Sequence, residues 1–152
     1  MLILLNIFLI VSINNEEKKL INNVLDNLHY YASVAEGNNY FNLFDEEAIF
    51  FGTDATERWN KKEFQDYALE RFNKGDGWTY KSISRNIYLN SDMNTAWFDE
   101  ELDNKKYGIF RGTGVLAKVN GIWKIKQYNL LLPIPNELLI NYSKEIKEFL
   151  DN

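Results

Sequence analysis

The stretch GIFRGTGVLAKVNGIWKIKQYNLLL, residues 108–132, decides the fold of this chain. Both halves are rich in apolar, β-branched and aromatic side chains, and Asn120-Gly121 joins them. An Asn-Gly pair between two such runs is a strong hairpin signal, because both central positions of the tight turn need a positive φ. The stretch therefore predicts two antiparallel strands, 108–119 and 122–132.

The segments before and after this hairpin complete an α+β pattern. Strand-like runs cover 48–51, 78–90 and 95–102, whereas apolar positions at three- and four-residue spacing predict a helix over 16–36 that ends at Gly37. Asn60, three residues before Glu63, predicts the start of a second helix, and Asn136 can cap a terminal one. Helices followed by long antiparallel strands indicate a curved sheet with helices across one side, and a pocket between the two layers.

Composition excludes several classes of function. The chain has 152 residues, the modal size of one domain, and a net charge of −5 without a basic block, which argues against nucleic-acid binding. It contains no cysteine and a single histidine, so we expect no disulfide, no thiolate site, no metal and no cofactor. Aromatic residues make up 15% of the chain, more than a plain core needs, and we expect some of these rings to line a cavity.

The N-terminal run MLILLNIFLIVSI, residues 1–13, is apolar but far shorter than the roughly 20 residues of a membrane-spanning helix. It lacks the basic start and the small-residue cleavage site of a secretory signal. Two alternatives stay open: an atypical signal or mis-assigned start, or a strand or helix packed on the domain. We accordingly divide the chain into an apolar segment, 1–15, and a domain, 16–152. We favour the cytoplasm, with secretion or a periplasmic location if the run is a signal.

Side-chain alternation along the strands predicts which residues face the pocket. In the last strand Lys124 and Lys126 mark the side that faces solvent. The residues that alternate with them are therefore expected to face inward. In the strand before it, the parity with the apolar end is taken as inward, which includes Arg111. Asp99 or Glu101 of the preceding strand is expected to supply the anion for this cation, and Asp99 is expected nearly opposite it. The ligand-binding residues predicted in this way are Trp97, Arg111, Thr113, Trp123, Gln127 and Asn129. An Asp99–Arg111 pair can equally be a structural salt bridge that fixes strand register.

Three side chains are candidates for proton transfer: His29, Asp54 and Asp99. His29 lies at the edge of the apolar stripe of the first helix, where it can reach the cavity or act as a structural hydrogen-bonder. Asp54 and Trp59 belong to the loop 52–59, and such loops often edge a pocket. We therefore add Trp59 to the ligand-binding set, although Asp54 and Thr56 can also simply make turn hydrogen bonds.

Several segments in the same order also resemble the SnoaL-like branch of the nuclear transport factor 2-like superfamily. They are AIFFGTDATERW (48–59), EFQDYA (63–68), WTY (78–80), AWFDEEL (96–102), RGTGVL (111–116) and WKIKQYNLLLPIPN (123–136). The resemblance implies a cone-shaped α+β fold, in which a bent antiparallel sheet wraps around helices and a deep apolar cavity. It also implies frequent dimerisation through the sheet. The superfamily includes polyketide cyclases, ketosteroid isomerases, dehydratases, hydrolases and non-catalytic binding domains, so fold alone does not select an activity.

Two functional hypotheses follow. In the first, the domain binds a small apolar molecule with a polar end, and as an enzyme it would be a cofactor-free isomerase, cyclase or hydrolase. In the second, it is a non-catalytic interaction module that dimerises through exposed sheet. The residues leave open whether the chain is catalytic, and we favour ligand binding.

Overall fold

A computed structural model describes residues 2–151, with side-chain burial described from residue 11 onward. Its centre is one sheet of six strands: β1 (Phe44–Phe51), β2 (Arg58–Asn60), β3 (Lys81–Leu89), β4 (Thr95–Asn104), β5 (Gly108–Val119) and β6 (Ile122–Leu131). The strand order is β2-β1-β6-β5-β4-β3. Neighbouring strands are antiparallel except for β1 and β6, which run parallel.

The predicted hairpin forms at the expected residues. Asn120 and Gly121 have φ values of 52° and 81°, as the tight turn requires, and they connect β5 directly to β6. The strand predictions were confirmed to within a few residues, although the run at 78–90 begins its strand only at Lys81.

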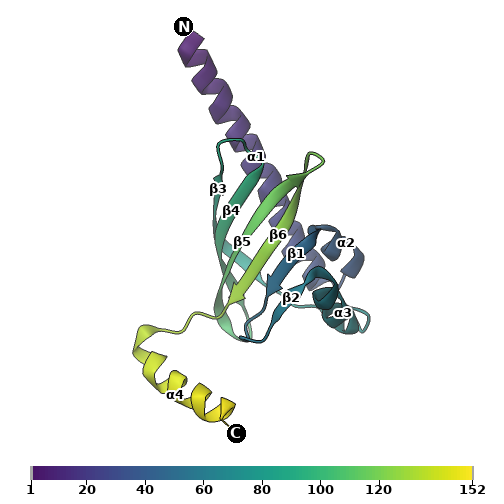
Figure 1. Cartoon of the computed structure of the whole chain (residues 1–152), viewed down its shortest axis with the longest axis vertical. Coiled ribbons are helices and arrows are strands. Elements are labelled where there is room, and N and C mark those ends of the chain that lie inside the picture. The colour runs from purple at the N-terminus through teal and green to yellow at the C-terminus, as the bar shows by residue number, and fades with distance from the viewer. Residues whose placement is uncertain (1, 152) are drawn as a thin grey trace.

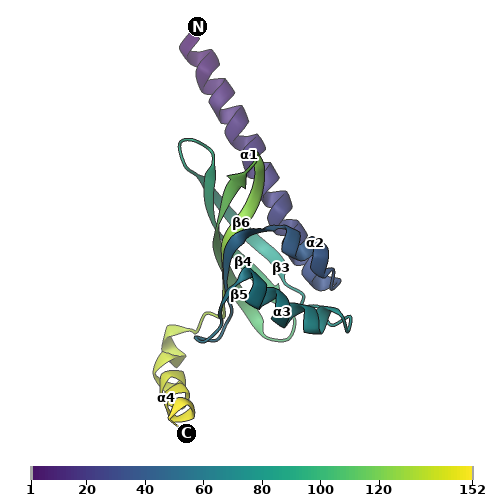
Figure 2. The same cartoon turned by 45° about the vertical axis from the view of Figure 1, so that its right-hand side comes forward.

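Helices α1 (Leu2–Ser33), α2 (Gly37–Asn42) and α3 (Lys61–Phe72) cover one side of the sheet, which we call the inner face (Figures 1 and 2). No helix lies on the opposite side, the outer face, in either view of residues 2–151. The fold class is therefore α+β, with a curved sheet against helices. A short 3-10 turn, η1 (Asn136–Leu138), leads into α4 (Leu139–Leu150), which stands apart from the sheet (Figure 1).

Helix α3 begins as the sequence predicts. The Asn60 side chain accepts a hydrogen bond from the Glu63 backbone N–H, and the Glu63 carboxylate accepts one from the Asn60 N–H. The end of the first helix was predicted wrongly at Gly37. Helix α1 ends at Ser33, Ala35 takes the left-handed conformation with φ 57°, and Gly37 starts α2. A Cβ at Gly37 would lie within 2.4 Å of the Leu69 side chain, so this glycine permits close packing of α2 against α3.

The predicted boundary between residues 15 and 16 falls within α1, which runs through it as one helix. From Ile21 onward α1 packs on the sheet through a buried stripe that includes Leu25, Leu28 and Ala32, whereas Val11 and Ile13 are exposed. The first half of the helix extends past the sheet (Figure 1). Among the described residues, no helix has the length and apolar character needed to cross a bilayer.

Candidate functional site

The centre of the candidate site is Glu100, a carboxylate with a fully buried side chain on the inner face of β4. Its strand neighbours on that face, Phe98 and Leu102, are core residues. A buried charge is tolerated only when other groups pair with it and satisfy its hydrogen-bonding capacity. The residues around Glu100 meet this demand from three other elements of the fold.

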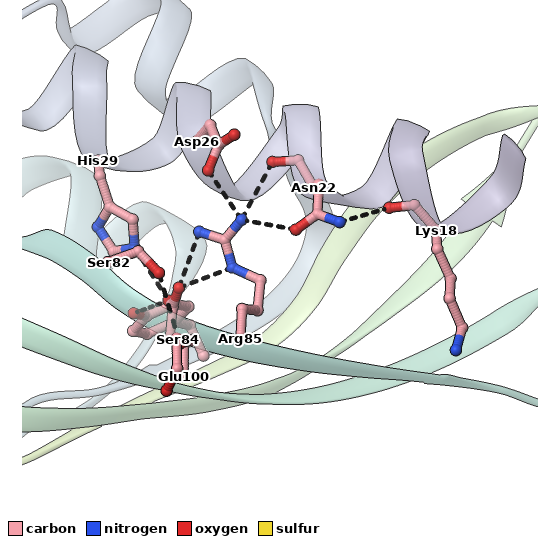
Figure 3. Close-up of polar contacts among 9 residues, drawn as sticks. Lys18, Asn22, Asp26, His29, Ser82, Ser84, Arg85 and Glu100 are labelled. Carbon is pink, nitrogen blue, oxygen red and sulfur yellow. Dashed lines mark hydrogen bonds and ion pairs between the residues drawn. The ribbon is translucent and has the colours of Figure 1, made fainter. Parts of the chain in front are cut away.

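Three side chains hold the Glu100 carboxylate. His29 Nε2, from α1, lies 2.9 Å from Oε1, and the Tyr128 hydroxyl, from β6, donates to the same oxygen at 2.8 Å. Arg85 Nε, from β3, donates to Oε2 at 2.8 Å (Figure 3). We call Glu100, His29, Arg85 and Tyr128 the Glu100 network. It ties β3, β4 and β6 to α1 at a single point.

Further contacts anchor Arg85 to α1. Its Nη1 donates to Asn22 Oδ1 at 3.0 Å and to Asp26 Oδ1 at 2.8 Å (Figure 3). The guanidinium is therefore shared between a buried carboxylate and an exposed one, Asp26. This arrangement gives the cation counter-charges on both the helix and the sheet.

A glycine makes room for the network on β5. A Cβ at Gly112 would come within 2.4 Å of the Tyr128 hydroxyl oxygen and 2.9 Å of Glu100 Cγ. These distances are shorter than any ordinary contact of a methyl group. Gly112 is therefore required for close approach of the Tyr128 hydroxyl to the carboxylate.

The network fixes the protonation of its members. Burial alone would raise the pKa of Glu100, but the hydrogen bond from His29, the charge that this ring carries when protonated, the charge of Arg85 and the Tyr128 hydroxyl hold that pKa below its ordinary value. Burial, followed by the nearby Glu100 charge, raises the pKa of Tyr128 well above its ordinary value. Glu100 is thus an anion and Tyr128 a neutral donor. A hydrogen bond to this anion requires a proton on His29 Nε2, and the other ring nitrogen, Nδ1, points away from Glu100 (Figure 3).

An aromatic pocket of about 400 Å³ opens beside the network. Rings from several segments form its walls, among them Trp59, Tyr67, Trp78, Tyr80 and Phe110. Its volume is within the range of small-molecule sites.

A much smaller cavity of about 20 Å³ lies between this pocket and the Glu100 network. His29 and Tyr128 line the small cavity. Both cavities share Phe50, Trp78, Tyr80 and Leu130 as lining residues, so these four form the layer between them. The small cavity has room for about one water molecule. His29 and Tyr128 are therefore the members of the network that border the space behind the pocket wall.

Of the three predicted proton carriers, the structure brings only His29 to this site. Asp54 is exposed and accepts hydrogen bonds from the Thr56 N–H at 2.8 Å and the Thr56 hydroxyl at 2.6 Å, the turn arrangement that was the alternative. Its neighbours Gly52 and Thr53 line the pocket, so the loop edges the pocket as expected. Asp99 lies on the outer face and accepts a hydrogen bond from Asn86 at 2.9 Å.

The inward placement of five predicted ligand-binding residues is wrong. The strand registers put them together with Asp99 on the outer face, where Trp97 is 48% exposed. Asp99 stands opposite Thr113, and the residue opposite Arg111 is Glu101, so the expected Asp99–Arg111 pair is also wrong. The five residues are Trp97, Arg111, Thr113, Gln127 and Asn129.

A bulge in β6 explains the error for Gln127 and Asn129. Ile125 pairs with Leu116 and Gln127 with Val115, so one extra residue, Lys126, lies between them. A bulge of this kind shifts by one residue the alternation of side chains between the two faces of the sheet. The inward residues are therefore Trp123 and Ile125 before the bulge, and Tyr128 and Leu130 after it.

Glycines explain the error on β5. Its inner face carries Phe110, Gly112, Gly114 and Leu116. Because the two glycines have no apolar side chain, the pattern of apolar residues along β5 does not show which residues face inward. On β4 the inward residue Glu100 is itself charged, so it was not considered as part of the core.

The two remaining tryptophans of the predicted set are on the inner side. Trp59 lines the pocket, as predicted. Trp123 is buried, but its Nε1 donates to Glu17 at 2.7 Å and Lys118 lies over its ring, which places it under α1 rather than in the pocket. Within the described part of the chain, no cluster of three or more metal-ligating side chains is present.

Three members of the network, Glu100, Arg85 and Tyr128, were missed by the sequence analysis. One signal was available for Glu100. Asp99, Glu100 and Glu101 are consecutive in a strand, and strict alternation must turn either the middle one or its two neighbours inward.

Replacement of Glu100 by glutamine tests the network. At pH 7 we expect Glu100→Gln to lower the free energy of unfolding by about 3 kcal/mol, because it removes the charge that faces buried Arg85. The pKa of Glu100 is lower in the folded state than its ordinary value of 4.5, so this stabilisation is present above that pH and is lost as the pH falls through the folded-state value. Urea titrations at pH 7 and in acid measure both effects.

The matched control for this experiment is Glu101→Gln, on the exposed outer face. We expect it to change the free energy of unfolding by less than about 0.5 kcal/mol. Equal effects of the two substitutions at pH 7 would contradict the role given to Glu100.

Solved structures with the same architecture are numerous and distant in sequence. They include a proposed scytalone dehydratase from Novosphingobium aromaticivorans, with 17% identity over 82% of this chain and 89% of that one, and a TM-score of 0.66. A protein of unknown function from Pseudomonas putida, described as NTF2-like, has 10% identity over 82% and 91%, and a TM-score of 0.67. A proposed dehydratase of the NTF2-like family from Streptomyces avermitilis has 6% identity over 80% and 99%, and a TM-score of 0.68. At these identities the likeness establishes the fold alone.

No curated protein matches the sequence. The model of the SnoaL-like domain family, in contrast, matches residues 21–135, which include the part of α1 that carries His29 and the whole sheet. The chain therefore belongs to the SnoaL-like family and has the nuclear transport factor 2-like fold.

Proposed function

We propose that this chain binds a small, largely apolar, ring-bearing molecule in the aromatic pocket, with a polar end of the ligand directed toward His29. The observation that carries the proposal is the position of the Glu100 network beneath the aromatic walls. Apolar walls with a few converging polar groups are typical of small-molecule sites. The walls supply burial and ring stacking, and the histidine supplies one oriented polar contact.

The same geometry supports acid–base chemistry. With its proton on Nε2, His29 offers the lone pair of Nδ1 as a proton acceptor, while Glu100 fixes the ring and stabilises the imidazolium that forms. The chemistry proposed is proton transfer without a cofactor, as in an isomerase, cyclase or hydrolase. Mass spectrometry of molecules that co-purify with the protein would identify a ligand, and loss of its turnover in His29→Gln would support the catalytic role.

Binding of a fluorescent probe tests the pocket. We expect Trp59→Leu to weaken binding of 1-anilinonaphthalene-8-sulfonate about tenfold, because a lost ring contact costs about 1.4 kcal/mol. Trp97→Leu is the matched control, since Trp97 lies on the outer face. Fluorescence titration measures both affinities. If Trp97→Leu weakened binding and Trp59→Leu did not, the pocket would be assigned to the wrong face.

The tautomer of His29 tests its orientation. Because His29 is the only histidine, long-range ¹H–¹⁵N spectra report a single imidazole. In spectra of the neutral ring we expect the proton on Nε2 in the native protein. In Glu100→Gln we expect a mixture of tautomers, because an amide can donate as well as accept. A predominant Nδ1–H form in the native protein would exclude Nδ1 as the proton acceptor.

A second proposal concerns assembly: the outer face is the contact surface of a homodimer. The Tyr88 and Trp97 rings stack there with centroids 5.9 Å apart, and both are nearly half exposed. Ile83, Ile109 and Leu131 are also exposed strand residues. Exposed apolar patches on a protein surface commonly mark interaction sites. A purely structural module of this kind would dimerise whether or not the pocket binds a ligand.

Sedimentation velocity of the full chain at micromolar concentration tests assembly. We expect a dimer for the native chain and a monomer for Trp97→Asp, because a charge at the contact surface cannot be solvated after association. Ile122→Asp, at the 61% exposed tip of the β5–β6 hairpin, is the control and should remain dimeric. A native chain that is strictly monomeric would refute the proposal.

A further inference from the structure

Helix α4 has an apolar face that nothing in the described chain covers. Residues 131–150 are exposed throughout, apart from the half-buried Ser143. Within this segment Leu139, Tyr142, Ile146 and Phe149 recur at alternating spacings of three and four residues, which aligns them on one face of the helix. They are 51%, 41%, 50% and 80% exposed. This spacing is typical of a helix that packs against another surface along its whole length.

The linker before α4 directs it away from its own sheet. Pro133 and Pro135 restrict their own backbone and that of the residues before them to extended conformations. Pro135 has φ −55° and ψ 137°, as in an extended polyproline segment. Such a segment acts as a semi-rigid spacer, so α4 is carried out beyond the end of β6, as Figures 1 and 2 show.

The outer face of the sheet carries a row of residues, headed by two stacked rings, that matches α4 in length. A helix of 12 residues is about 18 Å long, and four neighbouring strands span about 14 Å. Tyr88, Trp97, Val115 and Gln127 form one row across β3, β4, β5 and β6, because each pairs with the next in the strand register. A helix laid along this row would contact the stacked rings at one end.

Charge favours a protein surface over a lipid surface as the occupant. The segment 136–151 carries four acidic and two basic side chains, and the whole chain has a net charge of −5. Amphipathic helices that bind anionic membranes are instead rich in lysine and arginine on their polar face.

We propose that α4 of one copy lies across the outer face of the sheet of a second copy, and that the second copy returns the same contact. The proposal rests on the homodimer proposed above and specifies how it is held together. Two reciprocal helix-on-sheet contacts are comparable in scale to a stable interface, which buries roughly 1,200–2,000 Å² in total. Such an exchange covers both the apolar face of α4 and the exposed Tyr88 and Trp97 rings within one symmetric dimer.

Substitutions on the two faces of α4 test this exchange in the full chain. Ile146→Asp combined with Phe149→Asp places charges on the apolar face, and we expect at least a tenfold rise in the dimer dissociation constant by sedimentation equilibrium. Ile140→Asp is the matched control, because Ile140 is 81% exposed and points away from that face. We expect its dissociation constant to be unchanged. Circular dichroism checks that α4 stays helical in both proteins.

Cross-linking identifies the surface that α4 contacts, since the native chain has no cysteine. An Ile146→Cys protein, on the apolar face, is mixed with a mass-tagged Thr113→Cys protein from the outer face, and a short bis-maleimide is added. We expect a cross-linked species that contains one chain of each mass. An Ile140→Cys protein mixed with the same partner should give much less of it.

The possible outcomes separate the proposals. A dimer that survives the double substitution in α4 but not Trp97→Asp would overturn the exchange and leave dimerisation through the sheet in place. A monomeric native chain would overturn both, without bearing on the ligand pocket. If α4 instead bound vesicles of phosphatidylglycerol and the double substitution removed only that binding, a lipid surface would be the occupant and the exchange would be wrong.

Discussion

The carboxylate of Glu100 has no access to water, and its charge has to be balanced from within the fold. His29, Arg85 and Tyr128 do this from α1, β3 and β6, and Gly112 on β5 leaves the space for them. Polar contacts from α1, β3 and β6 and the identity of one glycine on β5 therefore meet at a single side chain. This constraint also orients the only histidine, so the element that stabilises the fold and the element that prepares the site are the same.

Much of the fold was predictable from the sequence, because its signals are local. The Asn120-Gly121 turn and the Asn60/Glu63 cap specify their own geometry, and the periods of the apolar residues separate strands from helices. Ala35 shows the limit of such signals: a residue with a Cβ takes the left-handed position, and nearby Gly37 is needed for packing instead.

The site was predictable only in part, because it depends on which way each strand faces. One extra residue, Lys126, changes the face to which the later side chains of β6 point. Two glycines on the inner face of β5 leave that strand without a clear pattern of apolar residues. The locations of His29 and Trp59 beside a cavity were predicted, because helix position and loop position are less sensitive to such shifts, while their roles stay predictions. The network around Glu100 could not be derived from single residues, because its members lie up to 71 positions from Glu100 in the sequence.

The sheet order has a consequence for synthesis of the chain. Strands β1 and β2 join the rest of the sheet only through β6, which is the last strand to be made. Until the ribosome has released β6, the β1–β2 pair has no sheet to extend and β5 keeps an open edge. Such edges are prone to pair with other chains. Aggregation during translation is thus a specific hazard of this topology. The hazard ends when β6 pairs with β5 on one side and with β1 on the other.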